Sequence, residues 1–118
     1  MPTACDPIIR QVLRDESITR GLGDIEGRML MEWLADWTVL FADAARSDDD
    51  AWRMTNRLCR RARAINKFVQ MWQNPATRNG AGQLAAVERF RWPLPPGPIP
   101  TVRLMEQILN WENRFPDE

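Results

Sequence analysis

The chain has 118 residues, of which 44% are hydrophobic and 27% charged, and its formal net charge is zero. This length and balance predict a single folded domain over residues 1–118 and exclude an intrinsically disordered chain. The sequence contains no histidine, which excludes the catalytic triads that use imidazole and most catalytic zinc sites.

The sixteen basic and sixteen acidic residues are sorted along the chain. Residues 1–50 carry five basic and eleven acidic side chains, residues 51–100 carry nine and one, and residues 101–118 carry two and four. The three segments therefore have net charges of −6, +8 and −2. Such sorting predicts either complementary helices within the domain or a basic surface that binds an acidic partner.

Hydrophobic periodicity predicts an all-α protein, a small bundle of about five helices. The first helix is expected to begin at Asp6, with Pro7 in its first turn, and to be interrupted by Gly21 and Gly23. A second helix over residues 24–45 has Asp24 as its expected cap. Its wide apolar face consists of Leu30, Trp33, Leu34, Trp37, Leu40, Phe41 and Ala44. The opposite polar stripe consists of Arg28, Glu32, Asp36 and Asp43.

A third helix is predicted over residues 50–73, after a short turn and an acidic cap. The short connection predicts that the second and third helices form a long antiparallel hairpin at the centre of the bundle. A shorter fourth helix is expected over residues 83–90. Residues 91–100 contain five of the nine prolines, and they predict an extended strap that carries the last helix to its docking site. A ligand for a polyproline-reading domain is the alternative role of this run.

The last helix is predicted over residues 101–115, with Thr101 as its cap. Its candidate docking or oligomer contacts are Leu104, Ile108, Trp111 and Phe115. Because a stiff connector precedes this helix, it can dock on its own bundle or on a neighbouring copy in a swapped homodimer.

Few residues outside these helical patterns suggest chemistry. Glu32 and Asp36 lie one turn apart, but paired carboxylates on a polar stripe are typically solvated or salt-bridged. Cys5 and Cys59 lack the spacing of a zinc or redox motif, and packing is the expected role of Cys59 despite the arginines that follow it. Core packing also explains at least four of the six tryptophans. No catalytic residue, metal, cofactor or small-molecule substrate is expected.

The basic residues of the third helix are the main candidate for a functional surface. At 100° per residue they share the half of that helix opposite its apolar side: Arg53, Arg57, Arg60, Arg61, Arg63 and Lys67. Acidic residues of other helices, among them Glu106 and Glu112, can cover them in surface ion pairs. Otherwise they are available to an acidic protein or to nucleic acid, although a pI near 6.3 is low for a dedicated nucleic-acid-binding domain.

These patterns predict a small, non-enzymatic, cytoplasmic helical protein that acts through protein–protein interaction, as a homodimer or as a subunit of a larger assembly. The alternative is a nucleic-acid-associated protein that contacts phosphates through the basic face of residues 50–73. No membrane partner is expected, because the chain lacks a signal-like start and an apolar run long enough to span a bilayer.

Overall fold

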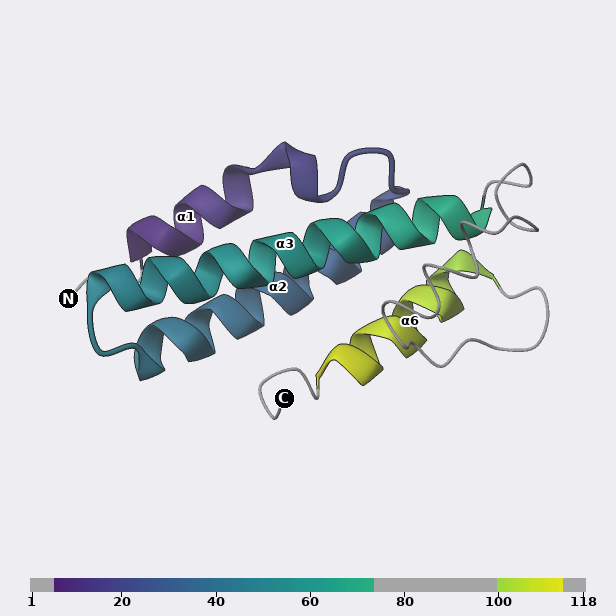
Figure 1. The fold of residues 1–118 in the computed structure, drawn as a ribbon. Helices are drawn as coiled ribbons and strands as arrows, with labels where there is room; N and C mark the ends of the chain where they lie inside the picture. The colour runs from purple at the N-terminus through teal and green to yellow at the C-terminus, as the bar shows by residue number, and fades with distance from the viewer. Residues whose placement is uncertain (1–5, 74–99, 114–118) are drawn as a thin grey trace.

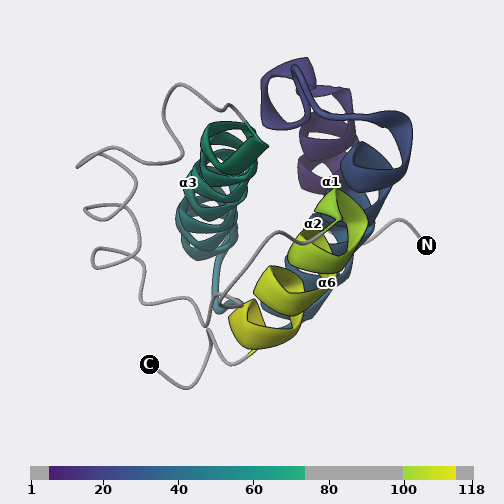
Figure 2. The same cartoon turned by 90° about the vertical axis from the view of Figure 1, so that its right-hand side faces the viewer.

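Two long antiparallel helices form the centre of the molecule. The computed structural model describes residues 6–73 and 100–113, and within them lie four α-helices and no strand. Helix α2 spans Asp24–Ala44 and α3 spans Asp48–Gln73. Helices α1 (Asp6–Arg14) and α6 (Thr101–Glu112) pack on opposite sides of this hairpin (Figures 1 and 2). The all-α prediction is confirmed, and the predicted central hairpin is present.

The described residues contain four α-helices rather than the five that the sequence predicted. The helix predicted over residues 83–90 and the proline-rich strap up to residue 99 lie outside the described residues, as does Phe115. The C-terminal helix ends at Glu112 instead of residue 115, and the backbone N–H of Asn113 bonds back to the carbonyl of Leu109. The predicted caps Asp24 and Thr101 are the first residues of α2 and α6 rather than their caps.

The N-terminal helix ends earlier than the glycines predicted. It stops at Arg14, because Asp15 caps a separate 3-10 turn, η1, over Glu16–Ile18. The Asp15 carboxylate accepts hydrogen bonds from the backbone N–H and from the hydroxyl of Ser17. An aspartate that binds the backbone two residues later competes with continuation of the helix. The chain then turns toward α2 at Gly21, whose φ of 85° is unfavourable for residues with a side chain.

Helix α3 begins at Asp48, two residues before the predicted start. The hydroxyl of Ser47 accepts a hydrogen bond from the backbone N–H of Asp50 at 3.1 Å, which satisfies one of the free donors of the first turn. Asp48, Asp49 and Asp50 all lie in that turn, where negative charge interacts favourably with the helix dipole.

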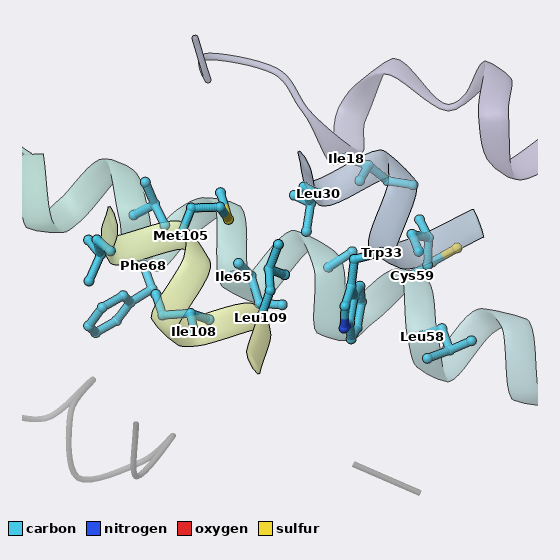
Figure 3. Packing of buried hydrophobic residues seen from close by; sticks show 14 of the residues in the cluster. Ile18, Leu30, Trp33, Leu58, Cys59, Ile65, Phe68, Met105, Ile108 and Leu109 are labelled. Carbon is cyan, nitrogen blue, oxygen red and sulfur yellow. The ribbon is translucent and has the colours of Figure 1, made fainter. Parts of the chain in front are cut away.

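The core lies where α2, α3, α6 and η1 meet, and Figure 3 shows its central side chains. Its fully buried apolar members are Ile18, Leu30, Leu34, Leu58, Ala62, Ile65, Val69, Leu104, Met105 and Ile108. Burial of each large aliphatic side chain contributes about 1.5–3 kcal/mol. Two of the predicted docking residues, Leu104 and Ile108, therefore belong to the core, and Trp111 packs against it.

The apolar face of α2 is narrower at its C-terminal end than the sequence predicted. The indole Nε1 of Trp37 donates a hydrogen bond to Oδ1 of Asn113, so α6 ends beside this part of α2. Leu40, almost one turn further along α2, is 56% exposed, and Ala44 is exposed as well. Helical periodicity places Leu40 on the apolar side, but the length of α6 decides whether it is covered.

Candidate functional site

Helix α3 presents its six predicted basic residues in three directions. Arg61 lies on the side that packs against α6, and Arg63 lies on the side toward η1. The other four project from the exposed side between them, and we call them the basic strip: Arg53, Arg57, Arg60 and Lys67. The strip covers about 80° of the helix circumference, which is narrower than the half of the helix that the sequence predicted.

Arg61 forms a buried ion pair between α3 and α6. Its Nε donates a hydrogen bond to Oε2 of Glu112 at 2.7 Å. The Glu112 side chain is completely buried and that of Arg61 is 26% exposed. The sequence predicted Glu112 as a partner in a surface pair, and this prediction is wrong about its location. The pair connects two elements that are far apart in the sequence, so Arg61 serves the fold rather than an external partner.

Arg63 connects α3 to η1. Its Nη2 donates to Oδ2 of Asp15 at 2.7 Å, and its Nε donates to the hydroxyl oxygen of Ser17 at 3.1 Å. The Ser17 hydroxyl in turn donates to the other carboxylate oxygen of Asp15. The hydrogen bond from Ser17, together with Arg63, holds the pKa of the Asp15 carboxyl below its usual value. The charge of Arg63 is therefore balanced within the chain.

The basic strip remains on the surface. Arg53 pairs with Asp50 of its own helix, yet its side chain is 74% exposed, and this hydrogen bond holds the pKa of the Asp50 carboxyl below its usual value. Arg57, Arg60 and Lys67 are exposed. Among the contacts of the described residues, Arg60 and Lys67 have no acidic partner. The strip therefore keeps positive charge that no described residue neutralises.

The outer side of α2 carries the opposite charge. Glu32, Asp36 and Asp43 are exposed there, and we call them the acidic stripe. Within the described part of the chain none of the three forms an ion pair with a neighbour. Glu32 and Asp36 are therefore solvent-exposed, one of the two outcomes predicted for paired carboxylates on a polar stripe. The molecule thus presents basic and acidic surfaces on different helices of the hairpin.

Cys59 is a core residue. It is 7% exposed, and burial raises the pKa of its thiol. The neighbouring Arg61 is directed toward Glu112 instead of toward this sulfur. In residues 6–73 and 100–113, no group of three or more histidine, cysteine, aspartate or glutamate side chains is arranged to hold a metal ion. None of the helices described here has both the length and the apolar character of a membrane span.

Two carboxamides of α3 have a role that the sequence analysis missed. Asn66 is 4% exposed, and its Nδ2 donates to the carbonyl oxygens of Ile18 and Arg20 at 2.7 and 3.1 Å. Gln70, one turn further on, donates to the same Arg20 carbonyl at 2.8 Å. The sequence offered one signal of this role, because the helical period places the Asn66 carboxamide on the buried side of α3. Together with Arg63, these residues attach the turn after η1 to α3.

Comparison of the chain with protein-family models, with curated proteins and with solved structures finds no match, so the function is argued from the surfaces described above.

Proposed function

We propose that this chain is a non-enzymatic protein-interaction domain whose basic strip binds an acidic surface of a protein partner. The observation that carries the proposal is the division of the arginines of α3. Arg61 and Arg63 meet carboxylates of the same chain, whereas Arg60 and Lys67 remain exposed without one. Like charges one turn apart on a helix repel by about 0.2–0.5 kcal/mol per pair, so an acidic partner would relieve an unfavourable arrangement.

The length and surroundings of the strip favour a protein over nucleic acid. Residues 53 to 67 extend over about 21 Å of helix, which suits a short acidic helix or segment. The acidic stripe lies on the neighbouring helix α2, and its carboxylates would repel a long polyanion that extended beyond the strip. The formal net charge of zero likewise gives no long-range attraction to nucleic acid.

Paired charge-neutralising variants test this proposal. The probes are a labelled glutamate-rich peptide and a duplex DNA, each titrated by fluorescence anisotropy at about 50 mM and at about 200 mM salt, where surface attraction differs strongly. The strip variant is Arg57→Gln with Arg60→Gln. The control variant is Arg28→Gln with Arg103→Gln, which removes two exposed charges from α2 and α6.

We expect the peptide to bind more tightly than the DNA, and the strip variant to weaken peptide binding about tenfold, since each exposed pair contributes up to about 1 kcal/mol. The control should change the affinity less than about twofold on the same reasoning. Equal losses in the two variants would contradict a role for the strip. Tighter binding of DNA that depends on Arg57 and Arg60 would support the nucleic-acid alternative instead.

The homodimer remains a separate proposal that rests on α6. Leu104, Ile108 and the Arg61–Glu112 pair would make the same contacts if α6 were exchanged between two copies. Light scattering on the full chain, measured up to high micromolar concentration, tests the exchange. A mass equal to one chain at every concentration would overturn it.

A further inference from the structure

A pocket of about 530 Å³ opens between the turn that follows η1 and the C-terminal half of α3. Three basic residues contribute to its lining: Arg20 from the turn and Arg63 and Lys67 from α3. Ser17 and Gln70 add a hydroxyl and a carboxamide. Only Lys67 also belongs to the basic strip, so the pocket and the strip are largely separate sites.

The wall formed by the turn is held firmly against α3. Asn66 and Gln70 both donate hydrogen bonds to the carbonyl oxygen of Arg20, and Asn66 is itself buried. A Cβ atom at Gly21 would lie 2.6 Å from Oε1 of Gln70, so the backbone approaches α3 as closely as glycine permits. These contacts form the pocket without any ligand, and a preformed site loses less entropy when it binds.

The lining carries more positive charge than the described residues neutralise. Arg63 is paired with Asp15, but the Arg20 and Lys67 side chains form no ion pair with any described residue. Arginine and lysine side chains are donors only, whereas the Ser17 hydroxyl already donates to Asp15 and accepts from Arg63. The lining donors that no described residue engages are therefore those of Arg20 and Lys67. Such a donor set suits an oxyanion, and guanidinium groups match phosphate oxygens particularly well.

We infer that this pocket binds a small phosphate-bearing anion with two or more negative charges, either free polyphosphate or a phosphorylated metabolite. Arg20 and Lys67, which have no ion-pair partner among the described residues, call for at least two negative charges on the ligand. A phosphate group carries up to two negative charges on the oxygens of a single phosphorus atom, whereas a carboxylate group carries one negative charge. This inference goes beyond the proposed protein interaction, because Arg57 and Arg60 do not line the pocket.

Calorimetry with inorganic tripolyphosphate as the probe tests the inference on the full chain. We expect a Kd below about 1 mM at 50 mM salt, and a perturbed amide resonance of Gly21 in a ¹⁵N NMR titration. Arg20→Gln with Lys67→Gln should weaken binding about tenfold or more, because two charge-assisted contacts are lost. These residues are exposed, so far-UV circular dichroism should show an unchanged fold.

The matched control is Arg57→Gln with Arg60→Gln, which removes the same charge from α3 outside the pocket. It should change the affinity for tripolyphosphate less than about twofold, since only screened long-range attraction is lost. Equal weakening by the two variants, equal affinity for citrate, or an unmoved Gly21 resonance would each overturn the inference. Because the strip and pocket variants are different pairs, either proposal can fail without the other.

Discussion

The ion pair between Arg61 and Glu112 gives the most demanding test of how α6 is held in place. Its N–O distance is 2.7 Å, and the Glu112 side chain is fully buried while Arg61 is 26% exposed. Desolvation of the buried carboxylate and of the partly buried guanidinium offsets most of their attraction, so the intact pair contributes little net stability. Removal of one partner, in contrast, leaves the other charge in a site that was built to neutralise it.

The two single substitutions should therefore differ in cost. Arg61→Met takes the guanidinium from a carboxylate that has no exposed surface, and we expect it to lower the free energy of unfolding by about 3–5 kcal/mol. Glu112→Gln leaves the partly exposed Arg61, which can reach water, and we expect a loss of about 1–3 kcal/mol. The double variant Arg61→Met with Glu112→Leu should lie within about 1 kcal/mol of the parent protein.

Urea unfolding followed by tryptophan fluorescence measures these differences as shifts of the midpoint at constant slope. The coupling energy from the double-mutant cycle should exceed about 2 kcal/mol, because both side chains belong to one buried contact. A loss below about 1 kcal/mol for Arg61→Met, or additive effects in the double variant, would refute the claim that this contact is a buried ion pair.

Four further outcomes are expected for single side chains that are buried or hydrogen-bonded. Thr55→Val should raise the free energy of unfolding by about 1 kcal/mol, because the buried Thr55 hydroxyl has no hydrogen-bond partner among the described residues. Thr38→Val should lower it by a similar amount, because the Thr38 hydroxyl donates to the carbonyl of Leu34 at 2.7 Å. Urea unfolding midpoints measure both changes. In a Cys5→Ser background, burial and the raised pKa of Cys59 should make its labelling at pH 8 at least about 100-fold slower than in denaturant, and equal rates would contradict its burial. Because the pKa of the Asp15 carboxyl is lowered from 3.8, its ionised form stabilises the fold above that pH, and this contribution is lost as the pH falls through the folded-state pKa. The parent protein should be more stable than Asp15→Asn by at most about 1 kcal/mol, measured by circular dichroism, and this difference should vanish between about pH 4 and pH 2. A difference that persists at about pH 2 would contradict the ion pair between Asp15 and Arg63.

The sequence predicted the ranges of the long helices α2 and α3 well, but it did not predict where α1 ends. Residues 24–45 and 50–73 have apolar side chains at helical spacing over many turns, and the observed α2 and α3 agree with these ranges to within two residues. The end of α1 was not predicted, because the hydrogen bond that the Asp15 carboxylate accepts from the backbone N–H of Ser17 outweighs the helix propensity of the following residues. Caps of this kind depend on side-chain geometry that residue types alone do not specify.

The candidate sites depended more strongly on contacts between distant residues. The sequence identified the basic half of α3, but it could not separate Arg61 and Arg63 from the strip, because their partners are 51 and 48 residues away along the chain. The pocket was equally hidden, since Arg20 and Lys67 come together only after the turn at Gly21 is attached to α3.

The sequence by itself determined that this protein is helical, that α2 and α3 form its centre, and that imidazole chemistry is excluded, because periodicity and composition are properties of the chain. Only the tertiary structure decided which charges are neutralised within the chain. The packing of α6 and η1 against α3 places Glu112 beside Arg61 and Asp15 beside Arg63. An ion pair requires a separation of a few ångströms, which the positions of residues in the sequence do not specify.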